Sequence, residues 1–352
     1  MPYQLCVLGC GTMGIAVLSG VLDNLASPRP STQDGDESGP STPMGSLILD
    51  PNSNPSSLPD RFIATVNRAE TVKKLRRTFD ALGPLGSTVQ VRQSADNVKS
   101  VAESDVVLLW SVPSPVRPNR RDLLTSFPPS SLSSPLFLLG WYPRDSCKPQ
   151  LAALLLLSPG MSEALEGKLL ISILAGTTIS MMREWVPSSC TVVRSMPNTP
   201  SKIREGMTVI SSLDPADPKT PVNREILTAL FTPLGKCRFM DEKHFDAVTA
   251  VCGSGPAFVC VVLEAMADGG VMMGLPRSEA LELAAQTMQG AARMVLQTGL
   301  HPAALKDSVT TPGGCTIAGL LMLEDGKVRS TVARCIQATT AHAAGLGASS
   351  KK

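Results

Sequence analysis

The sequence has few of the residues that build metal sites, nucleic-acid surfaces or disulfide frameworks. Its 352 residues include only 3 histidines, and its formal net charge is +2. A nearly neutral chain with short basic stretches does not predict binding to nucleic acid. None of the 9 cysteines stands in a CxxC pair, which favours reduced thiols over a zinc site or a disulfide framework. We therefore expect no metal.

The sequence also predicts neither a secretory signal peptide nor a membrane-spanning segment. The opening MPYQLCVLG has no basic region followed by an apolar run and a small-residue cleavage site. We expect no uncharged apolar run of the ~18 residues that a membrane-spanning helix needs. The sequence therefore predicts a cytoplasmic protein that does not enter a membrane.

What the sequence does contain is an alternation of strand-like and helix-like segments. The strand-like runs, most of them apolar, are QLCVL, RFIATV, TVQVR, DVVLLW, KLLISILAG, CTVVRSM and GMTVIS, with helical patterns after several of them. This alternation predicts an α/β fold, a Rossmann-like doubly wound sheet. From residue 244 onward the chain is helical and apolar on several faces, which predicts an all-α dimerisation domain. We assign 1–243 to a dinucleotide-binding domain and 244–352 to a helical dimerisation and substrate domain.

Two stretches do not fit this pattern. Residues 27–60 are rich in Pro, Ser, Gly and Asp and predict a mobile surface loop. Residues 111–146 are rich in Pro and Ser and follow the strand DVVLLW directly. A structureless loop of this length is uncommon inside a compact domain. It is an anomalous insert.

A glycine motif follows the first strand. Gly9, Gly11 and Gly14 form GxGxxG between a predicted strand and a predicted helix. In that context the motif indicates a dinucleotide site: glycines for the turn, for approach of the pyrophosphate and for helix packing. Backbone N–H groups at the helix start would face the phosphates.

The second strand indicates which dinucleotide binds. If it is RFIATVNR, its end carries Asn67 and Arg68, and a basic group there favours the 2′-phosphate of NADPH. If it is LILD, its end carries Asp50, and NADH is favoured. We prefer Arg68 because RFIATVNR runs into a helix, although an ordinary exposed arginine remains the alternative.

A second glycine-containing loop lies near the C-terminus. TTPGGCT, residues 310–316, precedes the helical pattern IAGLLMLE. Two glycines and several hydroxyls before a helix predict a pocket for an anion such as a carboxylate. The alternative is simple capping of the helix by Thr311 or Thr316.

Several sequence blocks, in the same order, resemble those of the pyrroline-5-carboxylate reductase family. They are VLGCGTMG, CKPQ, LLISILAG, MPNTP, AVCGSGPAF and LKDSVTTPGGCTIAGLLMLEDGKVRS. Together they cover most of the chain outside the two anomalous stretches. The resemblance implies reduction of L-1-pyrroline-5-carboxylate to L-proline by NADPH, with NADH as the alternative, in a homodimer or a larger assembly of dimers.

The resemblance also implies site residues. Lys148 and Thr316 are the expected catalytic residues, and the substrate is expected to contact Thr311, Gly313, Gly314 and Thr316. The expected cofactor contacts are Gly9, Cys10, Gly11, Thr12, Met13, Gly14, Asn67, Arg68, Asn97, Cys147, Lys148, Pro149, Ala175, Gly176 and Ser308. A protonated imine is already electrophilic, so hydride transfer needs mainly alignment and a dry site.

The insert departs from the family, in which the strand before CKPQ runs almost directly into that block. Removing residues 111–146 leaves the continuous, family-like DVVLLWCKPQL. We interpret the insert as translated intron or a gene-model error.

Two other functions stay open at this point. Another imine reductase would share this architecture, and an inactive dinucleotide-binding homologue is conceivable if the insert is real. β-Hydroxyacid dehydrogenases share the two-domain plan and place a catalytic lysine about four residues after a glycine turn. They are disfavoured, because the five residues after GSGPA include no lysine.

Overall fold

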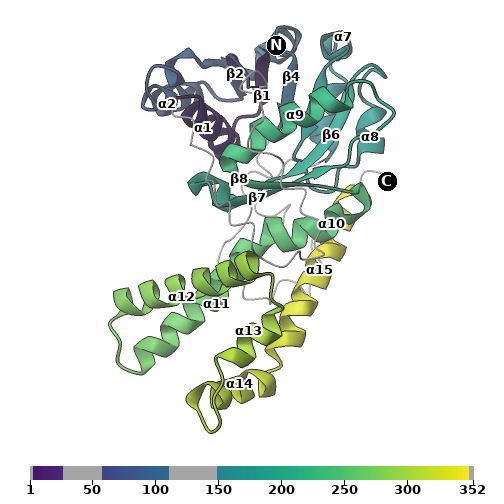
Figure 1. Ribbon diagram of the computed structural model, residues 1–352. Helices are drawn as coiled ribbons and strands as arrows, with labels where there is room; N and C mark the ends of the chain where they lie inside the picture. The colour runs from purple at the N-terminus through teal and green to yellow at the C-terminus, as the bar shows by residue number, and fades with distance from the viewer. Residues whose placement is uncertain (1–2, 27–57, 111–148, 349–352) are drawn as a thin grey trace, which may run out of the picture. The chain divides into compact units, whose positions relative to one another are not determined.

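The computed structural model describes residues 3–26, 58–110 and 149–348, and they fall into two compact units (Figure 1). The first unit takes in the described residues up to Asp246 together with those from Ala343 onward, and the second unit is Ala247–His342. Asp50 and nearly all of residues 27–60, with the whole insert 111–146, lie outside the described residues.

A single sheet of eight described strands organises the first unit, in the order β3-β2-β1-β4-β5-β6-β7-β8. The strands are β1 (Gln4–Leu8), β2 (Arg61–Val66), β3 (Gln90–Gln93), β4 (Val106–Leu109), β5 (Leu169–Ser172), β6 (Thr191–Met196), β7 (Gly206–Ser211) and β8 (Gly235–Met240). Strands β1 to β6 are parallel, and Leu8, Leu109 and Ser172 stand level at their carboxyl ends. The strand order reverses between β1 and β4, the point where such sheets bind ligands.

Helices cover both faces of this sheet because successive strand residues point to opposite sides. On one face Val7, Ala64 and Leu108 pack with residues of α1 (Thr12–Ala26), α2 (Ala69–Asp80) and α9 (Thr220–Phe231). On the other face Leu8 and Val107 pack with α3 (Asn97–Ala102), α6 (Pro149–Leu156), α7 (Met161–Leu165) and α8 (Ile179–Arg183). The predicted Rossmann-like doubly wound fold is confirmed.

The last two strands depart from the parallel pattern. β7 pairs with β6 in antiparallel fashion, through Ser195 with Ile210 and Met196 with Val209. The connection between them, residues 197–205, is a short 3₁₀ segment, and a parallel pairing needs a longer crossover. β8 pairs parallel with β7 after the α9 crossover.

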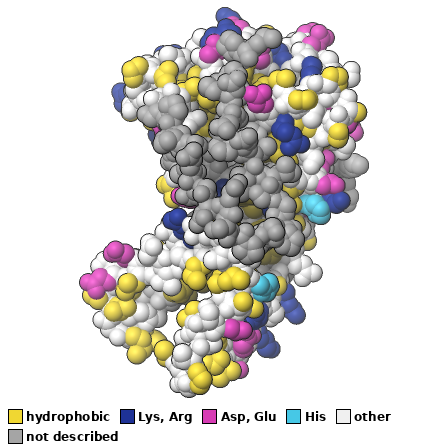
Figure 2. All heavy atoms as spheres, viewed as in Figure 1, with side chains coloured by type: hydrophobic (Ala, Val, Ile, Leu, Met, Phe, Trp, Pro, Cys, Tyr) yellow, Lys and Arg dark blue, Asp and Glu magenta, His cyan; other side chains and the backbone are white. Residues whose placement is uncertain are grey.

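Helices alone build the described part of the second unit. They are α11 (Gly255–Met272), α12 (Arg277–Thr298), α13 (Pro302–Ser308), α14 (Cys315–Asp325) and most of α15 (Val328–Ala348); a π-helix, Thr249–Ser254, leads into α11. Ala267, Ala280 and Ala284 form the small core between α11 and α12. Many large apolar side chains are left exposed (Figure 2), including Val261 at 64% and Met322 at 71%.

One helical run in the described residues passes a length and composition test for a membrane span. It is Glu242–Met272, with a mean hydropathy of 1.7 over its most apolar window, 11% of which is buried. The sequence expectation of no such run overlooked this stretch. A single apolar helix is weak evidence for a membrane, because a helix that packs against another protein surface has the same composition.

Candidate functional site

The glycine loop between β1 and α1 is tied to the neighbouring strand. The backbone N–H of Cys10 donates to the carbonyl of Thr65 on β2 at 2.8 Å, and that of Gly9 donates to the Thr65 hydroxyl at 3.4 Å. Gly9 has φ = 73°, a left-handed conformation that favours glycine. The loop is therefore fixed at the carboxyl edge of the sheet, where β1 and β4 adjoin.

Gly14 has a packing reason for lacking a side chain. A Cβ atom there would lie 3.1 Å from both the Cys10 sulfur and Val7 Cγ1. Helix α1 therefore lies close against β1, as the third glycine of the motif requires. Met13 is buried, whereas Thr12 is exposed at the first residue of the helix.

Cys10 lies within the loop but has no reactive character. The thiol is buried, and loss of solvation raises its pKa far above the ordinary range, with the nearby Cys6 adding to the shift. Cys10 therefore stays a protonated, apolar packing group.

Asn67 and Arg68 follow the end of β2 and are exposed. Arg68 is the N-cap residue of α2 and has extended backbone angles, and its side chain makes no capping hydrogen bond. Within the described residues it has no ion-pair partner. A free guanidinium thus stands at the carboxyl end of the strand beside the glycine loop, a position suited to a phosphate.

Asn97 is the first residue of α3, and its side-chain oxygen is buried without a hydrogen-bond partner. Nearly all buried polar atoms in proteins are paired, so an unpaired acceptor indicates a missing donor. A bound ribose or carboxamide group can provide that donor.

Ala175 and Gly176 lie in the loop that joins β5 to α8. Gly176 is buried with φ = 71°, and the following Thr177 is fully buried with an unpaired hydroxyl. Thr178 caps α8 by accepting the backbone N–H of Met181 at 3.2 Å. This loop stands at the same carboxyl edge of the sheet as the glycine loop, because β1, β4 and β5 are parallel.

Three predicted residues cannot be placed. Cys147 and Lys148 lie outside the described residues, and Pro149 begins α6 without a described side chain.

The C-terminal loop in the second unit has the backbone conformation of a tight glycine turn. Gly313 has φ = 68°, and the N–H of Gly314 donates to the carbonyl of Thr311 at 2.9 Å. A Cβ atom on Gly314 would lie 2.4 Å from the Thr311 hydroxyl oxygen, so a side chain there would force the Thr311 hydroxyl to move. Gly314 is the N-cap of α14 and leaves the helix N-terminus without a side-chain cap.

The hydroxyls around this loop divide into two groups. Ser308 and Thr310 donate to the carbonyls of Leu305 and Asp307, both at 2.7 Å. Thr311 and Thr316 make no side-chain hydrogen bond within the described residues, and neither caps α14. The capping alternative is therefore wrong, and both hydroxyls are available to a ligand beside the uncapped amides.

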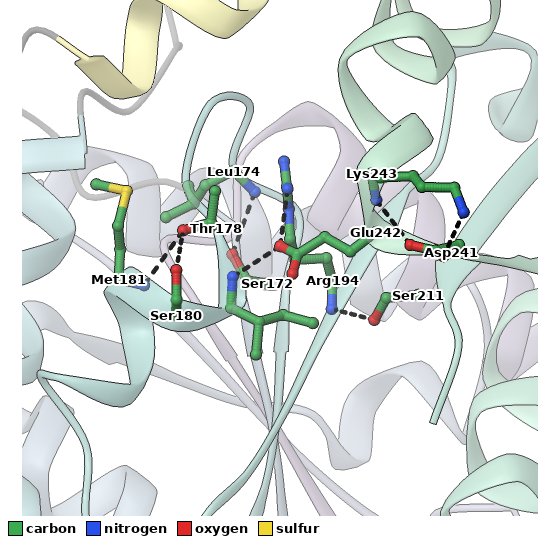
Figure 3. Close-up of polar contacts among 11 residues, drawn as sticks. Ser172, Leu174, Thr178, Ser180, Met181, Arg194, Ser211, Asp241, Glu242 and Lys243 are labelled. Atoms are coloured by element: carbon green, nitrogen blue, oxygen red, sulfur yellow. Dashed lines mark hydrogen bonds and ion pairs between the residues drawn. The ribbon is translucent and has the colours of Figure 1, made fainter. Parts of the chain in front are cut away.

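Sequence reasoning missed a charged cluster beside the β5–α8 loop (Figure 3). Arg194 of β6 is 3% exposed and its Nη1 donates to Glu242 Oε1 at 3.0 Å. The signal was present: an arginine inside the apolar strand TVVRSM needs a buried partner. The partner was not visible, because it lies 48 residues further along the chain.

Known proteins resemble this chain along nearly all of its length. Residues 242–346 match the family model described as pyrroline-5-carboxylate reductase dimerisation. A pyrroline-5-carboxylate reductase of Lophium arboricola is 41% identical, over 97% of this chain and 93% of its own. That of Schizosaccharomyces pombe is 42% identical, over 97% of this chain and 98% of its own.

A solved structure shows the same fold. The Plasmodium falciparum pyrroline carboxylate reductase with NADP bound superposes with a TM-score of 0.66 at 22% identity, covering 98% of this chain and 99% of its own. Identity above 40% over almost the whole chain, with the order of motifs and the described fold, settles the relationship. This chain belongs to the pyrroline-5-carboxylate reductase family.

Proposed function

We propose that the protein is an NAD(P)H-dependent pyrroline-5-carboxylate reductase, which reduces L-1-pyrroline-5-carboxylate to L-proline in the last step of proline biosynthesis. The observation that carries the proposal is the 41–42% identity, along nearly the whole chain, with relatives that bear this name. NADPH is the preferred cofactor, since Arg68 stands at the end of β2 with no ion-pair partner among the residues that the structure describes.

The first unit supplies the cofactor contacts in this proposal. The amides of residues 9–14 face the pyrophosphate, Arg68 the 2′-phosphate, and Asn97 offers its unpaired oxygen to a donor. Ala175 and Gly176 approach through backbone atoms, since Gly176 has no side chain to hold them apart. The bound dinucleotide supplies the hydride. Thr12, Met13, Asn67, Cys147, Pro149 and Ser308 complete the proposed set.

The second unit supplies the substrate contacts. The Gly313 and Gly314 amides and the Thr311 hydroxyl bind the substrate carboxylate beside the uncapped end of α14. The Thr316 hydroxyl accepts a hydrogen bond from the protonated ring nitrogen and so orients the imine carbon toward the hydride. Lys148 lies close to the substrate in this proposal. No further proton is needed for the hydride step, because the ring nitrogen is already protonated.

The domain division and assembly follow the family. Residues 1–243 form the dinucleotide-binding domain and 244–352 the dimerisation and substrate domain, in a cytoplasmic homodimer or an assembly of dimers. The match of residues 242–346 to a dimerisation model and the exposed apolar surface of the helices support this.

The decisive experiment is an assay of NADPH oxidation with L-1-pyrroline-5-carboxylate, with formation of proline measured by mass spectrometry. Turnover that needs this imine supports the proposal. Equal turnover of unrelated cyclic imines would indicate a general imine reductase. Dinucleotide binding without turnover of any imine would indicate an inactive homologue.

The insert 111–146 requires its own test. We propose that it is absent from the mature protein. We expect the sequence of the mature transcript to place the codon for Trp110 directly before the codons for the CKPQ block. A spliced message that encodes the insert would refute the proposal. The NADPH assay is therefore run on both forms of the chain.

A further inference from the structure

An ion pair between a buried arginine and a glutamate that is 31% exposed lies beside the β5–α8 loop and has no role in the proposed chemistry. The Arg194 side chain is 3% exposed, its guanidinium stands 4.9 Å from the centre of the Phe245 ring, and its Nη1 donates to Glu242 Oε1. Its Nη2 is buried without a hydrogen-bond partner. Exposed ion pairs contribute little stability and buried ones are often no better than apolar packing, so stability alone is a weak reason for this half-buried pair.

The same carboxylate oxygen makes a second contact, which connects the pair to α8. Glu242 Oε1 accepts the backbone N–H of Ile179, the first residue of α8, at 2.7 Å (Figure 3). That N–H has no partner within the helix, and a carboxylate at a helix N-terminus is favourable. Glu242 therefore fixes the point at which the β5–α8 loop ends.

The other end of the loop is held by Arg194 itself. Arg194 pairs in register with Ser172, the last residue of β5, and its backbone N–H donates to the Ser211 hydroxyl at 3.0 Å. Residues 173–178 thus run from a strand end beside Arg194 to a helix start bound by Glu242. The backbone of Arg194 thus lies at one end of this six-residue loop, and Glu242, which the Arg194 guanidinium contacts, binds the other end.

From this geometry we propose that Glu242 is a positioning residue for the dinucleotide. It holds Ile179, and through it the Ala175–Gly176 backbone, while Arg194 orients the Glu242 carboxylate. The inference rests on the proposed function, which assigns Ala175 and Gly176 to the cofactor. In this proposal, dinucleotide binding depends on an acceptor oxygen at hydrogen-bonding distance from the Ile179 N–H, and depends less on the negative charge of that acceptor.

Two single substitutions separate reach from charge. Glu242→Gln keeps an acceptor oxygen at the same distance along the side chain and removes the charge. Glu242→Asp keeps the charge and withdraws the oxygen by one methylene. Lys243→Gln is the matched control, because Lys243 is 69% exposed and its one ion pair among the described residues is with the exposed Asp241, two positions before it.

The measurement is calorimetric titration of each full-length protein with NADP⁺. Loss of a hydrogen bond to a charged group corresponds to at least about tenfold in affinity. We expect Glu242→Asp to weaken NADP⁺ binding by about tenfold, and Glu242→Gln and Lys243→Gln to stay within about threefold of the unchanged protein. In the NADPH assay, the KM for NADPH should rise in Glu242→Asp while the KM for the imine stays within about twofold.

The reverse ranking, with Glu242→Asp binding normally and Glu242→Gln weakly, would overturn the proposal. So would normal binding by both variants or weak binding by both. Thermal unfolding of each variant shows that a folded protein is being titrated. If the unchanged protein binds NADP⁺ but does not reduce the imine, the proposed function fails, and the titrations still decide the role of Glu242.

Discussion

Among the residues of the proposed site, some side chains hydrogen-bond within the fold and others have no side-chain partner in the described part of the chain. Ser308 and Thr310 donate to nearby carbonyls, whereas Thr311 and Thr316 do not. Arg68 is likewise without a partner in the described part of the chain, and Asn97 holds an unpaired buried oxygen. Substitutions at the free positions should change function and spare stability.

Thr316→Ala tests the orienting hydroxyl. Because Thr316 neither caps α14 nor makes another side-chain hydrogen bond in the described chain, we expect an unchanged unfolding temperature. Loss of a hydrogen bond to the charged ring nitrogen should lower kcat/KM for the imine by about tenfold or more. Thr316→Ser keeps the hydroxyl and should retain most activity. Equal activity of Thr316→Ala and the unchanged protein would remove Thr316 from the mechanism.

Arg68→Ala tests the choice of cofactor. The KM for NADPH should rise by about tenfold, while the KM for NADH stays nearly unchanged, because only NADPH carries the 2′-phosphate. Arg77→Ala is the control, since Arg77 is exposed in the last turn of the same helix. If both cofactors are affected equally, Arg68 acts through the general charge of the surface and not through the 2′-phosphate.

At the scale of elements, the close contact of α1 with β1 sets the glycine loop. Helix α1 can approach β1 closely because Gly14 has no Cβ atom. On the other side of the loop, the Thr65 carbonyl on β2 accepts a hydrogen bond from the Cys10 N–H. The position of the helix N-terminus therefore depends on a packing contact as well as on the loop itself.

Gly14→Ala should disturb this contact. The added Cβ lies closer to Cys10 and Val7 than ordinary packing allows, and overpacking typically costs about 1–3 kcal/mol. We expect a lower unfolding temperature and clearly weaker NADP⁺ binding by calorimetry. Gly20→Ala on the same helix meets Leu234, away from the loop, and should lower stability without a matching loss of affinity. Equal losses of affinity in both variants would contradict a local effect.

Most of the strands from β1 to β7 were predictable because they are apolar runs, and β3 was predictable from the short alternating stretch TVQVR. β8 was not named from the sequence, since Lys236 and Arg238 alternate with less exposed residues on a half-exposed strand. β7 runs antiparallel to β6 because the connection between them is short, and an apolar pattern does not show the direction of a strand. The Arg194–Glu242 contact joins distant positions, and no local pattern specifies it. The two glycine loops were predictable because a positive φ favours glycine, as at Gly9 and Gly313, and glycine is visible in the sequence.

At the scale of the whole molecule, many of the large apolar side chains of the second unit are exposed, and contiguous apolar surface of this kind marks interaction sites. Val261 is 64% exposed on α11, within the segment that matches the dimerisation model. A second copy of the chain that covers such residues accounts for both observations.

Val261→Glu should therefore lower the molar mass measured by light scattering after size-exclusion chromatography. A buried, unpaired carboxylate in an interface costs several kcal/mol, so dissociation is expected at micromolar protein concentrations. Val222→Glu is the matched control, because Val222 is 58% exposed on α9 of the first unit. An unchanged mass for both variants would place the interface elsewhere.

The first unit includes residues from both halves of the chain. It contains the described residues up to Asp246 and also Ala343, which is 3% exposed near the end of α15. During synthesis, the glycine loop and its sheet emerge from the ribosome first, while the remaining part of that unit emerges after the whole second unit. Domains generally fold as they are completed. We therefore expect the first unit to be complete only after the residues from Ala343 onward have been synthesised, although the glycine loop and its sheet were made long before.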